Sequence, residues 1–430
     1  MYICNCVTGD TEVLLGDNKS VKCIKDLKEG IDEVMTINPV TLEKEKSHFY
    51  NKFNTLPEKL YEIETISGRT VKCTPDHPFL IQRDGVMEWM ESENIMENDM
   101  LLVKHYVKSL PEDDGKLIII DIKNEKKDSL RIVTQPLSIR LTEACARLLA
   151  LCLSDRCYDE RNIFFNTPED MEDVISDIVS LGLSRPVCRV GIEESTILIS
   201  NEMRSFFSKI GLDFNDKFNK SLPHWLLDSP SSVKREFLAA FQGSNEGGSI
   251  YFNEEFGNVL LTKTNVCNKS EDCESCIVAE QISRMFRKLN IKNSVYIVKK
   301  IVNNKYFRNY FVIEILNSQR NVERFCDIIW YRYSIEKVRI GSILVEYLKI
   351  SLNNTGLFTI SEFKKKFSTE AYDVVLSPIL NVRKNLPIEQ VYDFTTKSGN
   401  HSFIVNSIVG SNCETPKLWE SDTKSIASLI

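Results

Sequence analysis

The sequence lacks the features of membrane and secreted proteins. No run of about 18 apolar residues occurs in the 430-residue chain, so we expect no transmembrane helix. The start, MYICNCVTGD, has no basic segment followed by an apolar run, and it predicts no signal peptide. Thirteen cysteines without such a signal are typical of free thiols in a reducing compartment. The sequence predicts an intracellular protein, cytoplasmic or nuclear.

The chain also lacks an overall positive charge. A formal net charge of -7 argues against a protein that coats nucleic acid along its whole length. Residues 281–350 are the exception, with 14 Lys and Arg against 5 Asp and Glu. This local excess favours a DNA-facing surface, because phosphate contacts dominate DNA binding. A merely solvated charged face is the alternative.

The hydrophobic pattern predicts two or three domains of different class. Short strands separated by Gly, Asn and Asp are predicted at 11–15, 20–27, 33–37, 59–66 and 69–74, which indicates an all-β fold of curved hairpins. Residues 109–116 are predicted as a loop and 123–129 as a second, charged connector.

Helical periodicity begins near residue 138. A helix, hairpin, helix succession fills 222–350, and 138–220 has the pattern of a weaker copy. Such internal duplication predicts a pseudo-two-fold α/β domain. Strands are predicted again around 390–410, near the end of the chain.

Reactive residues lie near both ends of the chain. A thiol at Cys6 can attack the preceding carbonyl, that of Asn5, and convert the amide into a thioester. The thiol of Cys413 can take over the acyl group, and Asn412 can cyclise onto its own carbonyl and cut the chain behind it. Together these reactions would excise a segment and join what flanks it.

Four sequence blocks carry a family resemblance. In order, they are Cys6 with Gly9-Asp10-Thr11, Thr74-x-x-His77, Val391-Tyr392-Asp393-Phe394, and His401 through Asn412-Cys413. Their order and spacing around a large insertion resemble the Hint domain of an intein. The resemblance implies a horseshoe-shaped all-β splicing domain built from 6–135 and 370–412. Residues 1–5 and 413–430 would then be fragments of the host protein.

The resemblance also implies a role for each residue. His77 would protonate the departing amide nitrogen, and Thr74 would hydrogen-bond the same peptide. Asp393 would adjust the ionisation of the two thiols, and His401 would move a proton during Asn412 cyclisation. No cofactor is needed for splicing.

Each of three residues also has a purely structural explanation. Cys6 could be a small buried hydrophobe, His77 an ordinary turn residue, and Asp393 a solvated strand residue.

One residue departs from the intein pattern. Most inteins carry His before the terminal Asn, and this chain has Ser411. Two alternatives follow: His401 assists cyclisation by itself, or cleavage at Asn412 is slow.

The insertion, 138–350, resembles a LAGLIDADG homing endonuclease with repeats at 138–220 and 222–350. The motif copies are 148–155 and 237–247. The resemblance implies two close helices, with carboxylates at their ends that bind divalent metal, here Mg²⁺, against double-stranded DNA.

Both motif copies depart from the family at the acidic position. Asp155 is present, but Arg156 replaces the usual Gly. Asn245 stands at the second acidic position and is a poor Mg²⁺ ligand, whereas Glu246 follows directly. The metal ligands would be Asp155 and Glu246, and both lost and residual nuclease activity stay open.

A cysteine cluster within the insertion is a weaker candidate. Cys267, Cys273 and Cys276 include a C-x-x-C, but no nearby His or Cys supplies a fourth zinc ligand. We interpret it as a Cys-rich loop.

The flanks suggest the host. Joining them gives YICNCETP, which resembles the I-C-P-x-E-T-P segment of the second-largest subunit of DNA-dependent RNA polymerase. The expected partners are this host and double-stranded DNA, and the expected state is a monomer that contacts no membrane.

Two alternative functions stand beside splicing. The chain could be chiefly a site-specific DNA endonuclease, or a Hint domain that cleaves without ligating. Cys413 argues against the latter, because only ligation needs a nucleophile after the Asn. A multidomain binding protein would not explain why these blocks flank an insertion.

Overall fold

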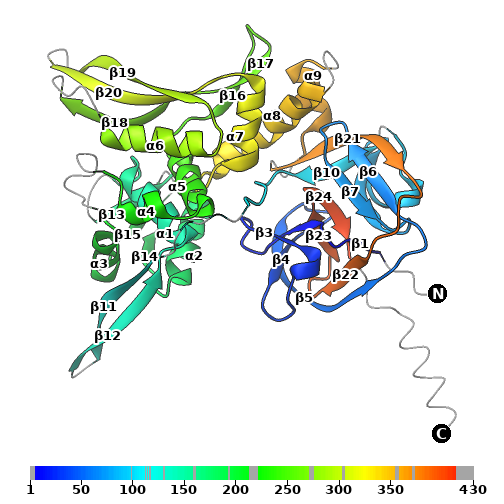
Figure 1. The fold of residues 1–430 in the computed structure, drawn as a ribbon, viewed down its shortest axis with the longest axis horizontal. Helices are drawn as coiled ribbons and strands as arrows, with labels where there is room; N and C mark the ends of the chain where they lie inside the picture. The colour runs from blue at the N-terminus through cyan, green and yellow to red at the C-terminus, as the bar shows by residue number, and fades with distance from the viewer. Residues whose placement is uncertain are drawn as a thin grey trace. The chain divides into compact units, whose positions relative to one another are not determined.

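A computed structural model describes residues 5–97, 99–111, 113, 115, 118–128, 131–157, 161–191, 194–212, 221–270, 276–302, 306–353, 358–369 and 373–412. These residues form two compact units, one within 1–109 and 345–430 and the other within 110–344. Figure 1 shows that the first unit combines blue strands from the start of the chain with orange and red strands from its end.

The first unit is a large, strongly curved sheet. Its strands are β1 (Val7–Thr8), β2 (Glu12–Leu14), β3 (Val21–Cys23), β4 (Glu33–Ile37), β5 (Lys44–Thr55), β6 (Tyr61–Thr65), β7 (Thr70–Cys73), β8 (Pro78–Arg83), β9 (Val86–Glu91), β10 (Met100–Lys104), β21 (Val374–Arg383), β22 (Val391–Thr396), β23 (Ser402–Val405) and β24 (Ile408–Ser411). They are joined in the order β3-β2-β23-β24-β8-β10-β21-β6-β7-β1-β22-β5-β4, and β9 pairs with β8.

The sheet closes partly on itself. Strand β4 ends the strand order, yet the Ile37 backbone N–H donates to the Ser402 hydroxyl on β23, and that hydroxyl donates to the Ile37 carbonyl, each over 2.7 Å. Short helical turns, Ile24–Asp26 and Ser92–Asn94, and helix α9 (Ile360–Phe367) complete the unit. The prediction of a mainly β unit built from both ends of the chain is confirmed.

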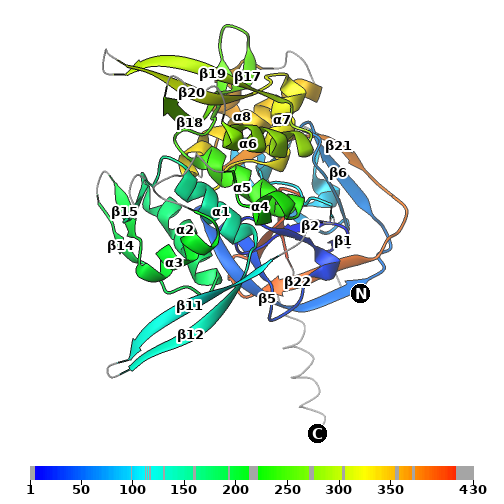
Figure 2. The same cartoon turned by 60° about the vertical axis from the view of Figure 1, so that its left-hand side comes forward.

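The second unit is α/β. It contains β11 (Ile119–Asp128), β12 (Arg131–Arg140), α1 (Glu143–Leu153), β13 (Asn162–Phe165), α2 (Pro168–Ser180), β14 (Val187–Arg189), β15 (Ser195–Leu198), α3 (Asn201–Lys209), α4 (His224–Asp228), α5 (Ser231–Gly243), β16 (Ile250–Asn253), β17 (Asn258–Leu261), β18 (Thr264–Ser270), α6 (Ile277–Lys288), β19 (Asn293–Val302), β20 (Tyr306–Ile315), α7 (Gln319–Ile328) and the start of α8 (Ile335–Asn353). Figure 2 shows these elements from a second side.

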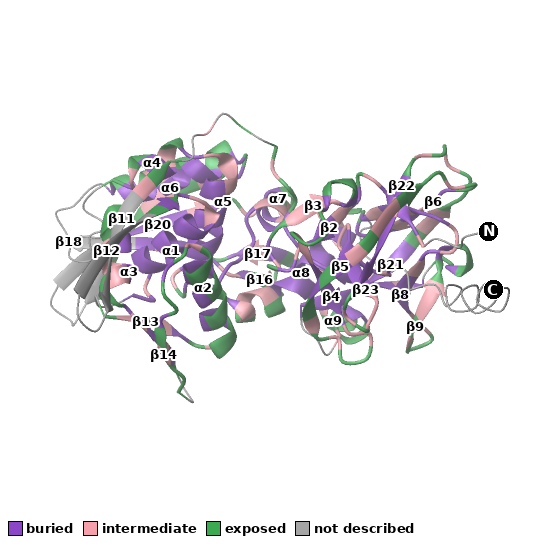
Figure 3. Cartoon of the chain, turned by 90° about the horizontal axis from the view of Figure 1, so that it is seen from below, coloured by how far each residue is buried: buried purple, intermediate pink, exposed green. Residues whose placement is uncertain are grey.

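Two halves of this unit share an order of elements. Each has a long helix (α1 or α5) followed by a three-stranded antiparallel sheet in which the last strand in sequence is central, β13-β15-β14 and β18-β20-β19. In each half a helix, α2 or α6, joins the first strand to the second. Helices α1 and α5 pack on each other and are almost entirely buried (Figure 3).

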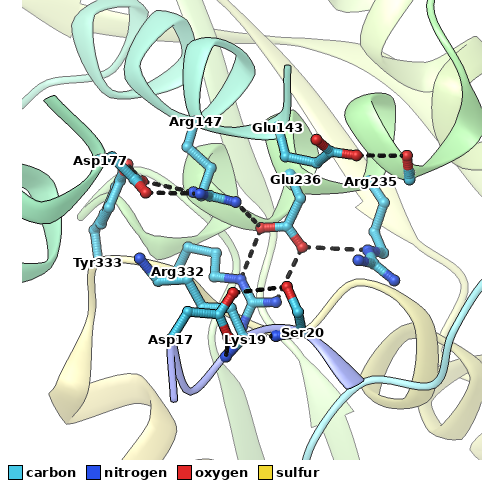
Figure 4. Close-up of polar contacts among 11 residues, drawn as sticks. Asp17, Lys19, Ser20, Glu143, Arg147, Asp177, Arg235, Glu236, Arg332 and Tyr333 are labelled. Carbon is cyan, nitrogen blue, oxygen red and sulfur yellow. Dashed lines mark hydrogen bonds and ion pairs between the residues drawn. The ribbon is translucent and has the colours of Figure 1, made fainter. Parts of the chain in front are cut away.

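A buried ion cluster ties the two halves together (Figure 4). Arg147 of α1 donates to Asp177 of α2 over 2.6 and 2.7 Å, and to Glu236 of α5 over 2.8 Å. Arg332 donates to the same Glu236 over 2.8 and 3.0 Å, and the Tyr333 hydroxyl donates to Asp177. Burial opposes ionisation of Glu236, but Arg332 and Arg147 outweigh it and hold its pKa well below the ordinary value.

The charged connector predicted at 123–129 is wrong. Residues 119–128 form β11, which pairs with β12 at every position from Ile119–Arg140 to Asp128–Arg131. An antiparallel hairpin satisfies its backbone groups by pairing, so a charged sequence does not exclude it. The strand predicted at 20–27 also ends early, at Cys23, where a helical turn begins.

The units divide near 109/110 and 344/345, whereas the sequence interpretation divided the chain near 135/138 and 350/370. Residues 110–135 therefore group with the α/β unit. Of the helices described, none is both long and apolar enough to cross a membrane.

Glu236→Ala should destabilise the α/β unit by about 3–5 kcal/mol, because Arg147 and Arg332 both lose the buried carboxylate that they share. Native-state hydrogen exchange of α1 and α5 amides measures this opening free energy locally. Glu172→Ala is the matched control: its pair with Arg185 is largely exposed, so less than about 1 kcal/mol is expected. Equal effects of the two changes would contradict a supporting role for the cluster.

Candidate functional site

The backbone of Cys6 is fixed on both sides by one residue. The Cys6 N–H donates to the Thr74 hydroxyl over 3.1 Å, and the Thr74 N–H donates to the Cys6 carbonyl over 2.9 Å. Cys6 is fully buried, in an apolar cluster with Leu60 and Val391. It directly precedes β1, which lies between β7 and β22. The predicted pair of Cys6 and Thr74 is therefore in contact.

A tight turn carries His77 from Thr74 into β8. The His77 N–H donates to the Thr74 carbonyl over 3.2 Å. The His77 carbonyl accepts from the backbone N–H of Ser92 over 2.9 Å and from its hydroxyl over 2.8 Å. Three hydrogen bonds thus fix the backbone that carries the imidazole.

The imidazole of His77 lies in an aromatic pocket. Its ring centroid is 4.7 Å from that of Phe79 and 6.0 Å from that of Phe403. A Cβ at Gly410 would lie only 3.0 Å from Nε2 of His77, so the glycine is what allows strand β24 to pass so close to the ring. His77 therefore connects the Cys6 side of the sheet with the strand that leads to Asn412.

Burial lowers the pKa of His77 to about 4, and interaction with the Asn5 backbone opposes this only in part. Neither ring nitrogen makes a hydrogen bond of ordinary geometry to a described residue. At pH 7 the ring is therefore neutral and beside the Asn5–Cys6 peptide.

Asp393 is buried on β22. It follows Tyr392, which pairs with Val7 of β1, so the strand register carries Asp393 toward Cys6. Its Oδ1 accepts the Phe394 N–H over 2.7 Å. A register shift between Asp393 and Thr395 interrupts the pairing with β5 here, as β-bulges do where a side chain must be re-aimed. The solvated-strand explanation of Asp393 is excluded by this burial.

Asn412 is fully buried directly after β24. Its side-chain Nδ2 donates to the Thr396 hydroxyl over 3.0 Å and to the Ser402 carbonyl over 3.2 Å. Its backbone N–H donates to the His401 carbonyl over 2.9 Å. The side-chain amide of Asn412, the predicted nucleophile, is thus held in one orientation.

Ser411 and His401 lie beside Asn412. The Ser411 hydroxyl is 3.0 Å from the His401 carbonyl oxygen and 3.2 Å from the Asn412 carbonyl oxygen, both acceptors. His401 adopts a positive φ of 46° at the start of β23, and its Nδ1 is buried with no hydrogen-bond partner among described residues. The backbone carbonyl of His401, rather than its ring, accepts from Ser411 and Asn412.

Strand β22 connects the two junctions. Its residues Val391 and Tyr392 pair with β1 next to Cys6, and Thr396 contacts Asn412. At about 3.3 Å per residue, the five steps from Val391 to Thr396 span roughly 16 Å of strand. Sequence analysis missed Thr396, and no motif indicated it, because its role depends on which strand lies next to the end of β24.

Some of the predicted site residues lie outside the residues that the structure describes. Cys413, and with it the far side of the Asn412–Cys413 bond, follows the last described residue, and Cys273 is also outside it. The side chain of Cys267 is not described, and Cys276 is buried at the start of α6. Among the cysteines whose side chains are described, none forms a disulfide.

The second candidate site lies at the ends of α1 and α5. Asp155 follows α1, and its Oδ1 is buried with no hydrogen-bond partner among described residues. Asn245 and Glu246 follow α5. Two cations also lie at these helix ends. Arg156 is buried 3.5 Å from Asp170. The Lys337 ammonium donates to the carbonyls of Gln242, Ser244 and Gly247 over 2.6–2.8 Å.

The Lys337 ammonium is strongly perturbed. Burial, and then the charge of Arg156, lowers the pKa of Lys337 to about 8, while Asp155 acts in the opposite direction. A positive charge in this position neutralises the carbonyl ends of α5, which attract cations.

Cys6 is buried directly before β1, and Asn412 is buried directly after β24 of the same sheet. This placement is the one expected if the two residues stand at the ends of a self-excising segment. The family model of the intein splicing domain matches residues 13–412. The chain belongs to this family, and the matched region ends at Asn412.

Curated relatives share low identity over most of the chain. The chain is similar to the DNA-directed RNA polymerase subunit Rpo1N of Methanocaldococcus jannaschii (24% identity, 96% of this chain, 34% of the relative). It is similar to the tRNA-splicing ligase RtcB of Pyrococcus horikoshii (27%, 83% and 38%) and to the DNA-directed RNA polymerase III subunit rpc2 of Dictyostelium discoideum (23%, 95% and 29%). It spans roughly a third of the length of these relatives.

Solved inteins align with a smaller part of the chain. The Ssp DnaB mini-intein variant M86 is 27% identical over 23% of this chain and 61% of that chain, with a TM-score of 0.21. The PabCDC21-1 intein is 22% identical over 25% of this chain and 74% of that chain, also with a TM-score of 0.21.

We expect His77 to remain neutral until the pH falls to about 4. Its folded pKa lies below the ordinary 6.5, so its contribution to stability is complete above pH 6.5 and is lost as the pH falls from 6.5 to 4. An NMR titration of the five histidines, in a Cys6→Ala, Asn412→Ala chain that stays intact, measures this pKa. His77→Gln assigns the resonance, and titration at or above pH 6.5 would contradict the burial argument.

Proposed function

We propose that the chain excises residues 6–412 and ligates its two flanks. The observation that carries the proposal is the shared strand β22, which lies beside Cys6 at one end and holds the Asn412 side chain at the other. Membership of the intein splicing-domain family gives the same function. Each step exchanges one bond for another, so no cofactor or oxidant is consumed.

In the first step, the Cys6 sulfur bonds to the Asn5 carbonyl carbon, the Asn5–Cys6 amide bond breaks, and the thiol proton passes to the Cys6 nitrogen. Thr74 accepts the N–H of this nitrogen and fixes the peptide during attack. His77 is neutral at rest, and the negative charge that develops beside it raises its pKa, so it can gain a proton and pass it to the departing nitrogen.

The later steps move the acyl group and release the segment. Cys413 attacks the thioester and frees the Cys6 thiol, with Asp393 adjusting the ionisation of the thiols. Asn412 Nδ2 then bonds to its own carbonyl carbon as the bond to residue 413 breaks, and His401 moves the proton from one nitrogen to the other. The freed amine of Cys413 attacks its own thioester and forms the peptide bond.

The host of the segment is an RNA polymerase subunit in this proposal. Two relatives named as RNA polymerase subunits match about 95% of the chain, and the joined flanks have the residues ICNCETP. The second-largest subunit is the one whose sequence resembles these flanks.

We propose a second function for the α/β unit, as a homing-endonuclease-like DNA-binding domain that does not cleave. Its support is the repeated order of elements, with a LAGLIDADG-like motif on each of the packed helices α1 and α5. Of the 14 basic residues in 281–350, Arg332 and Lys337 are engaged internally. Others are exposed, such as Arg284 and Lys288 on α6, and cations of this kind can contact phosphates.

The residues at the ends of α1 and α5 do not fit a divalent metal centre. Mg²⁺ prefers anionic oxygen ligands in octahedral geometry. Asp155 has a buried oxygen without a described hydrogen-bond partner, but Asn245 occupies the second acidic position of the motif. Arg156 and Lys337 also place positive charge at the ends of these helices. The described residues contain no group of three or more acidic, His or Cys side chains that could hold a metal ion.

Intact mass over time tests splicing. Ligation should produce a 407-residue segment and a joined 23-residue peptide, whereas cleavage without ligation gives flanks of 5 and 18 residues. Cys6→Ala should abolish the joined peptide, and Asn412→Ala should retain the C-terminal flank. A full-length mass that is stable even with added thiol would refute the proposal.

A DNA assay tests the second function. The probe is a duplex that encodes the joined flanks, since a homing endonuclease recognises the uninterrupted host gene. We expect binding that weakens steeply with salt and no strand cleavage with Mg²⁺. If Mg²⁺ causes nicking of this duplex but not of a plasmid that lacks its sequence, the proposal that the metal centre is lost would be wrong.

A further inference from the structure

We propose that Ser411 is a catalytic residue that stabilises the oxyanion formed when Asn412 cyclises. This inference rests on the proposed splicing function and deepens its last cleavage step. Ser411 stands where most inteins carry histidine, so the chain must meet the needs of this step with another group.

The backbone places the Ser411 hydroxyl beside the reacting carbonyl. Ser411 ends β24 and pairs with Ser402 of β23, which holds its backbone in register. Its hydroxyl is 3.2 Å from the carbonyl oxygen of Asn412, the group that Nδ2 must attack. The same hydroxyl is 3.0 Å from the His401 carbonyl oxygen. In this geometry one proton serves two acceptors.

The two carbonyl oxygens compete for the hydrogen bond of the Ser411 hydroxyl, and this competition stabilises the transition state more than the ground state. At rest both are neutral carbonyl oxygens, and the shorter contact, to His401, takes the larger share of the hydrogen bond. As Nδ2 attacks, negative charge gathers on the Asn412 oxygen only, and charged acceptors form bonds about twice as strong. The Ser411 hydroxyl therefore shifts its hydrogen bond from the His401 oxygen to the Asn412 oxygen as the reaction approaches the transition state. Such an interaction, stronger in the transition state than in the ground state, accelerates the reaction.

The nucleophile is fixed at the same time. Thr396 and the Ser402 carbonyl hold the Asn412 amide, and both belong to strands of the same sheet. Ser402 is itself anchored to Ile37 through its hydroxyl. The amide and the oxyanion donor are thus positioned by one rigid framework, which is the arrangement that preorganised catalysis requires.

The atoms balance without an outside reagent. The Nδ2–carbon bond forms and the carbon–nitrogen bond to residue 413 breaks. One proton leaves Nδ2 and one is gained by the departing nitrogen, a transfer assigned to His401. Ser411 keeps its own proton throughout and only redirects it. A serine can therefore replace the donor function of histidine, but not its capacity to carry a proton.

The test isolates this step in a Cys6→Ala background, where no thioester forms and Asn412 cyclisation alone releases residues 413–430. Intact mass gives the release rate for the parent chain, Ser411→Ala and Ser411→Thr. We expect Ser411→Ala to be at least about 10-fold slower, since loss of one oxyanion donor costs about 10²–10³ in enzymes with well-buried sites. Ser411→Thr, which keeps the hydroxyl, should retain most of the rate.

Two controls separate folding from chemistry. Ser20→Ala removes an exposed hydroxyl that donates to Asp17 and should leave release unchanged. With Cys6 restored, thiol-induced loss of residues 1–5 should proceed at the same rate with and without the Ser411→Ala substitution, because that step does not use Ser411.

The outcomes distinguish this inference from the function beneath it. Release from Ser411→Ala at the parent rate would overturn the role of Ser411 and leave splicing intact. If the parent Cys6→Ala chain releases nothing, while added thiol still removes residues 1–5 from the chain that retains Cys6, Asn412 cyclisation itself fails, and the inference fails with it. A chain inert at both junctions would refute the splicing proposal.

Discussion

The pair of hydrogen bonds between Cys6 and Thr74, one to the Thr74 hydroxyl and one from its backbone N–H, fixes the position from which the rest of the site is built. It docks β1 against β7, and β1 in turn aligns β22. Strand β22 then carries Asp393 toward the first junction and Thr396 to the second. Two junctions that lie at opposite ends of the sequence thus belong to one hydrogen-bonded framework. The large insertion between them does not interrupt it, because β10 and β21, which flank the insertion, also pair with each other.

Burial gives this framework its chemical character. His77 lies between two phenylalanine rings and is neutral at pH 7, so it cannot form a standing ion pair with anything near Cys6. The thiol itself lies among apolar side chains. Apart from the buried Asp393, the groups near the reacting residues are therefore mostly uncharged, and a donor such as Ser411 matters because a developing charge is poorly screened in buried surroundings. The α/β unit uses the opposite strategy, since its core holds fully formed ion pairs around Glu236.

The sequence predicted the parts of the site whose chemistry is covalent. Cys6 and Asn412 could be proposed because bond rearrangement restricts which residue types can act, whereas Thr74 and His77 were proposed from the family resemblance. The structure places Thr74 in hydrogen-bond contact with Cys6 and buries all four residues. Thr396 and Gly410 could not be found, since their importance comes from the strands beside them. Residues 123–129 were mistaken for a connector, although 123–128 belong to strand β11, because their charges show no hydrophobic alternation. Glu236, an acidic residue within the motif helix, gave no sign that it would be buried between two arginines.

Both junctions adjoin strands in the interior of the sheet order, β1 between β7 and β22 and β24 between β23 and β8. Excision would therefore keep every described strand of the sheet and its described neighbours, so these strands would keep their arrangement in the product. The product would instead acquire a free amino terminus at the Cys6 nitrogen, within a buried site where this nitrogen faces a threonine hydroxyl. A charged ammonium is costly there, which favours the neutral amine or a loosened first strand. The released segment should thus differ from its precursor chiefly in the protonation and mobility of its first residues.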